Sequence, residues 1–391
     1  MLHNDQGRTN PSERPGLARR LIRPFRPAKS GTMPAGLVLA VVVGALVVAM
    51  LGNADATLRR SEGKANNAAW RTDVAKDVAS VADALHLTAP RRDIDSAMGR
   101  SDAKGPSLDQ LVAEQAALNG ATGDASNGTS DTTADQTALT PKLRTPTADN
   151  PLKLWVGGDS VSQTFGTQLI RVAEGTGLFK GTLDFHLGTG LAVPTYFNWP
   201  EHLVKDVVPT NPDVIVTSFG TNDGQNIQLD NGKVLQRFSP EWYDEYQKRV
   251  GQTMDLLKSP NNDRVVMWCT PPPMGPTTGT HGMDRITYIG WLEAQTRPWV
   301  HFCDTWAFFS DANGQFQHSL PMADGEVRGL RQKDDIHMSD IGGTLLGWVV
   351  IEDLQAYTDL SAAKTQPKPN EIRPPDVKER TQVPQSMPGA L

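Results

Sequence analysis

The chain has 391 residues and a formal net charge of −6. Its 35 glycines and 28 prolines, with only 38% hydrophobic residues, indicate that part of this length is linker and not compact enzyme. The acidic balance excludes the overall basic surface of a nucleic-acid-binding protein, so no nucleic-acid partner is expected.

The N-terminus predicts a membrane anchor. Residues 1–33 form a basic tail, in which Arg and Lys greatly outnumber Asp and Glu, and an uncharged apolar segment follows at 34–52. That segment is about long enough to cross a hydrocarbon core, and the basic flank predicts a cytoplasmic N-terminus with the remainder extracytoplasmic. A cleaved signal peptide is the closest alternative, because Asn53-Ala54-Asp55-Ala56 resembles a cleavage site. We therefore expect a single-pass protein of the cell membrane.

Three further segments lie outside the predicted enzyme domain. Residues 53–100 contain a short helical pattern and are predicted to be a juxtamembrane stalk. Residues 101–150 are rich in Ala, Gly, Ser, Thr and Asp and are predicted to be a flexible linker. The Pro-rich polar residues 361–391 are predicted to be a disordered tail.

Residues 151–360 alternate between strand and helix signals. This alternation predicts an α/β domain with a parallel central sheet and helices on both faces, and such sheets place active sites at the carboxyl ends of their strands. Strands are expected at Leu152–Val156, Leu183–Leu187, Val214–Phe219, Val265–Cys269 and Val300–Cys303. Helices are expected near Ser162–Glu174, Ser239–Leu257 and Met283–Gln295, and a last one begins near the N-cap residue Ser339.

The two cysteines, Cys269 and Cys303, each end a predicted strand. On the exported side of a membrane they can form a disulfide, and two buried free thiols are the alternative. Neither cysteine has the local setting of a catalytic thiol.

Three polar segments follow predicted strands or precede the last helix, and together they contain the parts of a serine acyl-transfer site. Ser160 supplies a hydroxyl at a helix start, His337 supplies a base, and Asp334 lies three residues before that base. A nucleophile, a base and an acid that orients the base are what such chemistry requires. Each segment alone is weak evidence, because a serine after a glycine turn more often caps a helix.

The sequence also offers donors for an oxyanion. Asn222 follows the third expected strand, and Gly188 and Gly190 follow the second. A side-chain amide and a backbone N–H at these positions would stabilise the developing negative charge. We favour Gly190 over Gly188 as the backbone donor, and both remain open.

In this order and spacing, these segments resemble the four sequence blocks of the SGNH (GDSL-like) hydrolase superfamily: Gly-Asp-Ser at 158–160, a glycine loop at 188–190, Gly-x-Asn-Asp at 220–223 and Asp-x-x-His at 334–337. The flanking sequences look like an exported bacterial branch of unassigned substrate. The resemblance implies a flavodoxin-like three-layer α/β/α fold and site roles for Ser160, Asn222, Asp334 and His337. Val161 stands where Leu is usual, a departure that leaves the nucleophile in place.

The resemblance implies an extracytoplasmic serine esterase that cleaves O-acyl esters, O-acetyl first among them, of cell-envelope glycans or lipids. The same triad serves O-acyltransferases, for which a membrane acyl-donor partner is expected, and a catalytically silent domain that binds a glycan or a protein is a third hypothesis. An ordinary α/β-hydrolase elbow, a dinucleotide loop and a two-metal phosphoesterase fit the sequence poorly. No metal or organic cofactor is expected.

Overall fold

The computed structural model describes residues 106–122 and 140–366, without 279 and 281, together with Val74, Asp77 and Val78. The predicted tail at 1–33, the anchor at 34–52, most of the stalk and residues 367–391 lie outside this part. Among the described residues, no helix combines the length and the apolar character needed to cross a membrane.

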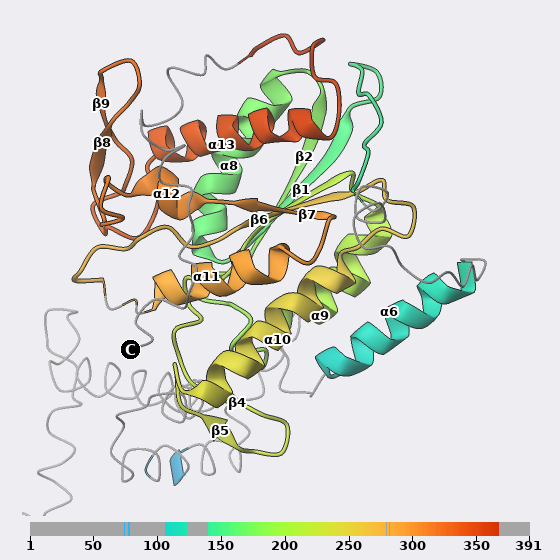
Figure 1. Cartoon of the computed structure of the whole chain (residues 1–391), viewed down its shortest axis with the longest axis vertical. Coiled ribbons are helices and arrows are strands. Elements are labelled where there is room, and N and C mark those ends of the chain that lie inside the picture. Colours follow the sequence, from blue (N-terminus) through green and yellow to red (C-terminus); the bar gives the residue numbers. More distant parts are fainter. Residues whose placement is uncertain are drawn as a thin grey trace, which may run out of the picture. The chain divides into compact units, whose positions relative to one another are not determined.

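A five-stranded parallel sheet forms the centre of the domain (Figure 1). Its strand order β2-β1-β3-β6-β7 is the flavodoxin-like order, counting only the strands of this sheet. The central strands β3 and β6 are buried along their whole length, as expected for a sheet covered on both faces. The strands span β1 Leu152–Gly158, β2 Phe179–Phe185, β3 Val214–Ser218, β6 Val265–Cys269 and β7 Val300–Cys303.

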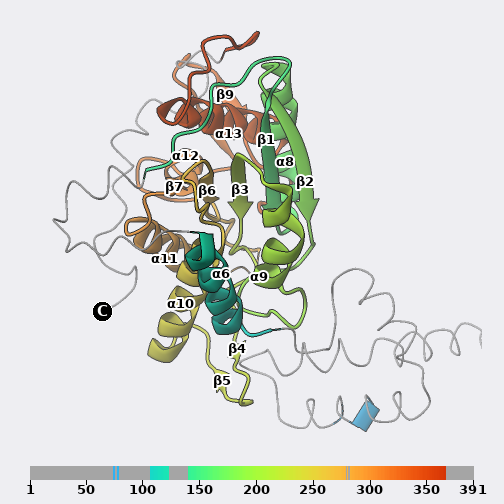
Figure 2. The same cartoon turned by 90° about the vertical axis from the view of Figure 1, so that its right-hand side faces the viewer.

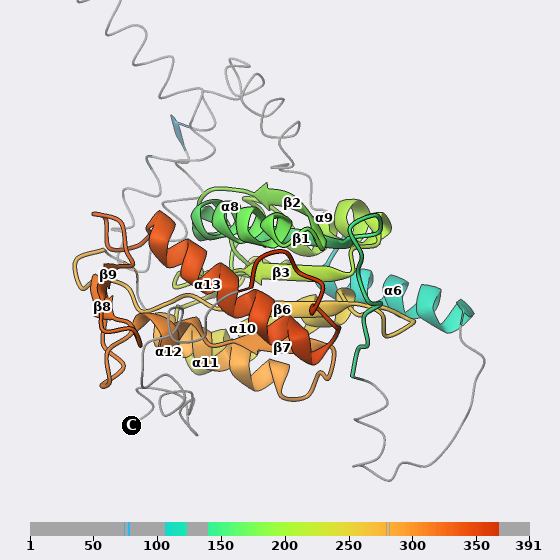
Figure 3. The same ribbon diagram turned by 90° about the horizontal axis from the view of Figure 1, so that it is seen from above.

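Helices cover both faces of this sheet, and each face has its own apolar core (Figures 1 and 3). On one face lie α8 (Ser160–Gly175) and α13 (Asp340–Asp353). On the other lie α9 (Trp199–His202), α10 (Pro240–Leu256) and α11 (Met283–Ala294). The three layers predicted from the alternating pattern are therefore present, and Ser339 caps α13 through a bond from Gly342 N–H at 3.0 Å.

The helix α13 packs closely against α8, and glycines make this possible. A Cβ on Gly343 would meet the side chain of Gln168 and the Cα of Phe165. One turn later, a Cβ on Gly347 would meet Leu169. Residue numbers rise together along the two helices, so they run parallel. This register brings the residues just before α13 level with the first turn of α8.

Part of the predicted linker is a helix. Leu108–Thr122 form α6, which packs against α9 and α10 (Figure 2). Ser107 and Gln110 form a capping box, since Gln110 N–H donates to Ser107 Oγ at 3.2 Å and Ser107 N–H donates to Gln110 Oε1 at 2.8 Å. Leu111 is only 1% exposed. The prediction of a flexible linker over 101–150 is thus wrong for this stretch. Its helical periodicity is weak, but the capping box and the buried side chain of Leu111 stabilise the helix.

The predicted domain boundaries are also too narrow. Leu143 is buried, and its N–H donates to Tyr357 O, so the domain begins before residue 151. At the other end Lys364 N–H donates to Thr176 O at 2.9 Å, so residues 361–366 belong to the fold and not to a tail.

Smaller elements decorate the sheet. Two hairpins were not predicted: one is formed by β4 (Ile227–Gln228) and β5 (Val234–Leu235), and the other by β8 (Ser319–Pro321) and β9 (Val327–Gly329). The remaining short elements are the π-helical turn Leu203–Val207, the 3₁₀ turns Val208–Thr210 and Leu354–Ala356, and α12 at Thr305–Phe309.

The cysteines lie side by side as free, buried thiols. Cys269 at the end of β6 is in register with Cys303 at the end of β7. The hydrogen bond with the Cys269 thiol and burial raise the pKa of Cys303 well above its ordinary value, so Cys303 is a protonated core thiol.

Candidate active site

Ser160 occupies the first position of α8, directly after the central strand β1. Asp159 is the N-cap residue of this helix, and its Oδ1 accepts a hydrogen bond from Val161 N–H at 2.9 Å. The N–H groups of a first helical turn have no partner within the helix and point toward the space in front of it. The half-buried Ser160 therefore has its hydroxyl beside backbone donors.

Asp334 and His337 face one another across a tight loop. The loop is closed at its base by a bridge between Arg331 and Met338 and by a bond from Gln332 N–H to His337 O at 2.8 Å. Asp334 Oδ1 accepts the N–H groups of the two residues that end the turn, and its Oδ2 lies 2.6 Å from His337 Nδ1. Three bonds to a single carboxylate fix the histidine ring relative to the backbone.

The same bonds determine the charge of Asp334. Partial burial raises the pKa of this carboxyl, but the bonds from the His337 side chain and from backbone N–H groups lower it further, to about 2. Asp334 is therefore an anion at neutral pH. It favours the tautomer in which Nδ1 of His337 carries the proton and Nε2 is free to act as a base.

Asn222 connects three of the four sequence blocks through hydrogen bonds. It lies on the loop after β3, and its Nδ2 donates to Asp159 Oδ2 at 3.2 Å and to Thr189 O at 3.1 Å. The amide thus joins the nucleophile block to the glycine loop. Both of its N–H groups are engaged, so one bond must be exchanged before Asn222 can donate to an oxyanion.

The glycine loop after β2 approaches the floor of the site closely. A Cβ on Gly190 would lie 2.1 Å from Asp223 Oδ1, so no other residue fits there without movement. At Gly188 a Cβ would not be crowded. Glycine is favoured there because the backbone has a φ of +72°. The loop is held from below by Asp223 Oδ1, which accepts Ala192 N–H at 2.8 Å.

Two buried carboxyls lie beneath the site. Burial raises the pKa of Asp159 to about 7, and the charge of Asp223 raises it too, while the bond from Val161 lowers it. Burial likewise raises the pKa of Asp223, which also accepts a hydrogen bond from Tyr246 Oη at 2.8 Å. Both carboxyls accept backbone N–H groups, and neither contacts His337.

The packing of α13 on α8 brings the triad candidates to the same end of these helices. Ser160 begins α8, and His337 lies three residues before α13. In the described part of the chain, the hydrogen bonds of His337 go to Asp334 and Gln332 and not to Ser160. Catalytic hydrogen bonds are often long in enzymes without substrate and tighten when substrate binds.

A known protein family matches the part of the chain that contains all the candidate site residues. Residues 153–353 match the family described as "Protein of unknown function (DUF459)". The chain belongs to the DUF459 family. All four sequence blocks lie within the match, and in the fold three of them follow β1, β2 and β3 while the fourth precedes α13. The strand order of the central sheet is the one that the resemblance to SGNH hydrolases implied.

Solved structures with similar folds include three esterases or lipases. They are the carbohydrate acetylesterase Est24 from Sinorhizobium meliloti (15% identity, TM-score 0.35, covering 52% of this chain and 99% of that one), a carbohydrate esterase family 3 protein from Talaromyces cellulolyticus (14%, 0.35, 52% and 97%) and the lipase Lip_vut3 from a goat rumen metagenome (16%, 0.35, 54% and 99%). At such TM-scores these likenesses carry no argument about activity. A comparison with curated proteins found no match.

Several residues that support the DUF459 site had no sequence signal. Arg249 of α10 donates to Leu191 O at 3.0 Å and to Ala192 O at 3.1 Å, so it also holds the glycine loop in place. Arg331 is only 2% exposed and lies 5.5 Å from the ring centres of Phe309 and Phe316. It supports the base of the Asp334–His337 loop.

Other polar residues pair with groups outside the candidate triad. Asp335, next to the candidate acid Asp334, pairs instead with His318 at 3.0 Å. Its φ of +59° lets the loop reverse direction at this position. His301 contacts Tyr357 Oη at 3.1 Å and lies 3.4 Å from Asp353, away from the site.

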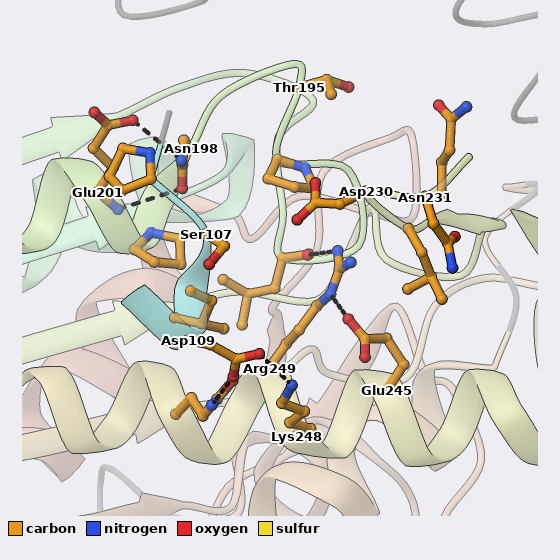
Figure 4. Close-up of a pocket in the computed structure, with 18 of the residues that line it drawn as sticks. Ser107, Asp109, Thr195, Asn198, Glu201, Asp230, Asn231, Glu245, Lys248 and Arg249 are labelled. Carbon is orange, nitrogen blue, oxygen red and sulfur yellow. Dashed lines mark hydrogen bonds and ion pairs between the residues drawn. The ribbon is translucent and has the colours of Figure 1, made fainter. Parts of the chain in front are cut away.

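A cavity of about 520 Å³ lies beside the end of the glycine loop at Leu191 (Figure 4). None of the triad candidates lines this cavity. Its walls come from α6, α10, the β4–β5 hairpin and the loop that contains Leu191. Many of its charged groups are already paired, including Lys248 with Asp109 at 2.8 Å and Arg249 with Glu245 at 2.7 Å. The cavity therefore adjoins the loop that supports the site and is separate from the triad.

One cluster in the described residues has the composition of a metal site. Asp184, His186 and His202 each offer one ligand atom, and these atoms lie within 4.8 Å of one another. None of these three residues was predicted to be a site residue from the sequence.

Proposed function

We propose that this DUF459 protein is a serine esterase that cleaves O-acyl esters through an acyl-serine intermediate. The observation that carries the proposal is the 2.6 Å bond between Asp334 and His337 Nδ1 on a loop packed level with the first turn of α8. An acid that orients a histidine, next to a serine at a helix start, is the arrangement that nucleophilic acyl transfer requires.

In the proposed reaction His337 Nε2 accepts the proton of Ser160 as its oxygen attacks the ester carbonyl. Negative charge develops on the carbonyl oxygen, where the N–H groups of Ser160 and Gly190 and the Asn222 amide donate to it. Asn222 releases Thr189 O to do so. The imidazolium then protonates the leaving alcohol, and water activated by His337 cleaves the acyl-serine.

The proposed substrate is an O-acylated glycan or lipid of the cell envelope, with acetyl as the preferred acyl group. This part rests on the sequence, because the apolar segment 34–52 after a basic tail predicts an anchor with the DUF459 domain outside the membrane. Protease digestion of intact cells tests it: the domain is expected to be cleaved without lysis, and protection of the domain until lysis would contradict the location.

The activity is tested with the full-length chain purified in mild detergent. Release of p-nitrophenol from acetyl, butyryl and octanoyl esters is compared for wild type, Ser160→Ala and Ser162→Ala. Ser162 is the matched control, since it lies on the same helix and donates to Ser218 O at 3.4 Å without facing the triad loop. We expect Ser160→Ala to lose activity by at least about 10³-fold and Ser162→Ala to keep it.

Equal activity in wild type and Ser160→Ala would overturn the mechanism. If neither protein hydrolyses any ester, the esterase proposal fails. The O-acyltransferase alternative, for which the same triad is suited, would then be tested with an acceptor glycan, and the silent binding domain with the glycan alone.

A further inference from the structure

A cluster of two histidines and an aspartate lies at the carboxyl end of the edge strand β2. Asp184 is near the end of the strand, His186 follows it, and His202 ends the short helix α9. His202 Nε2 lies 2.6 Å from Asp184 Oδ2, and His186 Nε2 lies 3.4 Å from Asp184 Oδ1. Two imidazoles and one carboxylate thus meet from two separate elements, the end of β2 and α9.

A fourth residue fixes the orientation of one ring. His202 Nδ1 lies 2.8 Å from Asp206 Oδ2, so each nitrogen of this ring faces a carboxylate oxygen. Without a cation, these contacts form a network of hydrogen bonds and ion pairs. With a cation at Nε2, the Nδ1 proton stays with Asp206 and the Nε2 lone pair points to the cation. A histidine that donates its second N–H to a carboxylate is the usual outer support of a metal ligand.

The site is also rigid and accessible. The ring of His186 stacks on Phe197 with centroids 3.6 Å apart, and the fully buried Trp199 contacts its edge. The side chains of Asp184, His186 and His202 keep 20–22% exposure, so solvent reaches the ligand atoms. Three protein ligands with solvent access leave a position for water, which gives four ligands in total.

We propose that Asp184, His186 and His202 bind one first-row transition-metal dication, for which Zn²⁺ is the reference, with Asp206 orienting His202. Imidazole and carboxylate together suit Zn²⁺ and its neighbours, whereas Mg²⁺ and Ca²⁺ prefer all-oxygen sites. Ligand atoms on a tetrahedral Zn²⁺ lie about 3.3 Å apart, given bonds of about 2.0 Å. His186 Nε2 lies close to this distance from Asp184 Oδ1, at 3.4 Å, whereas His202 Nε2 contacts the other oxygen, Oδ2, at 2.6 Å. A small rotation of the Asp184 side chain would let one of its oxygens share a cation with both rings.

The metal would have a structural role. The segment between His186 and His202 contains Gly190, and coordination would join both ends of this segment to β2. No step of the proposed ester cleavage passes through the ion, so the site stands or falls independently of the esterase activity.

The test uses the full-length chain, free of any histidine tag and stripped with a chelator. Zn²⁺ affinity is measured by competition with a chromophoric chelator, and stoichiometry by elemental analysis after dialysis. We expect one Zn²⁺ per chain at micromolar or tighter affinity, with Mg²⁺ and Ca²⁺ failing to compete. Co²⁺ is expected to give the visible absorption of a tetrahedral site.

Variants assign the ligands. His186→Ala and His202→Ala are expected to weaken binding by at least about 100-fold, and Asp206→Asn by about 10–100-fold. His301→Ala is the matched control, because it removes a histidine beside a carboxylate, Asp353, with no second imidazole described beside it. It should bind as wild type does. Circular dichroism checks that each variant is folded. If an alanine variant does not fold, Asp206→Asn still tests the proposal, because this variant keeps all three ligands.

Absence of bound Zn²⁺ in the wild type would overturn the proposal and leave an ion-pair network around an imidazolium. Wild-type affinity in a folded His202→Ala protein would overturn it as well, because the metal would then be bound elsewhere.

Discussion

A Cβ on Gly347 would lie 3.0 Å from the Cα of Leu169, so α13 rests directly on the backbone of α8. This close contact leaves α13 little freedom to move toward or along α8. Because His337 immediately precedes α13 and Ser160 begins α8, this contact determines the distance between the proposed base and nucleophile.

Replacing Gly347 by leucine is therefore expected to reduce both stability and activity. The added side chain must push the helices apart, at a cost of about 1–3 kcal/mol in the free energy of unfolding. Urea melts and ester hydrolysis well below the melting temperature measure the two effects. Gly175→Leu is the control, because nothing lies within 4 Å of a Cβ at Gly175. Equal losses in both variants would show that the close contact is not responsible.

Asp334→Asn should lower kcat by about 10²–10⁴-fold with little change in fold. The neutral amide removes the anion that selects the reactive tautomer of His337, while it can still accept the backbone N–H groups of the turn. Asp335→Asn provides the comparison, since this neighbour pairs with His318 instead. The assignment of the triad acid would be reversed if Asp335→Asn caused the larger loss in kcat.

The two glycines of the oxyanion loop should respond differently to alanine. Gly190→Ala places a methyl group 2.1 Å from Asp223 Oδ1 and should displace the loop, so activity falls by at least about 10²-fold. Gly188→Ala meets nothing closer than the Tyr196 ring at 3.7 Å, and it should cost only about 1 kcal/mol for its left-handed backbone. Steady-state kinetics with thermal melts separate the two. A larger loss of activity in Gly188→Ala would favour that residue as the donor.

Asp159 predicts a pH dependence of stability. Its folded pKa of about 7 lies above the value of about 3.9 in an unfolded chain, so folding favours the protonated form. This contribution is complete below about pH 4 and is lost as pH rises toward 7. Relative to wild type, Asp159→Asn should therefore gain stability from pH 4 to 7, by an amount on the order of a few kcal/mol. Urea melts across this range measure the difference.

Asp359→Asn is the control for this pH series. Backbone bonding to Ser361 holds the pKa of Asp359 below its ordinary value, so this carboxyl stays ionised throughout the window. A flat difference between Asp159→Asn and wild type would show that Asp159 remains ionised in the folded protein.

The sequence predicted the elements whose signals are local. Val265–Cys269 and Val300–Cys303 are strands with the predicted bounds, because short apolar runs between turns suit fully covered strands. Ser339 caps its helix as its residue type suggested. The four sequence blocks could be recognised because each is a contiguous group of residues.

Features that depend on distant partners were missed. The second strand was expected at Leu183–Leu187 but forms at Phe179–Phe185, because β2 is an edge strand with polar residues that the apolar run does not include. Leu187, the last residue of the expected strand, is 48% exposed. The convergence of Asp184 with His202, and the clamp of Arg249 on the glycine loop, depend on tertiary packing that spacing along the chain does not encode.

The paired thiols in the core give the protein an internal reporter of opening. Cys269 and Cys303 are the only cysteines of the chain, and their exposed fractions are 1% and 4%. A thiol reagent can reach either sulfur only when the strands β6 and β7 lose their helical cover, which requires opening of the core. The labelling rate under native conditions therefore measures how often the domain opens, and no additional cysteine has to be introduced.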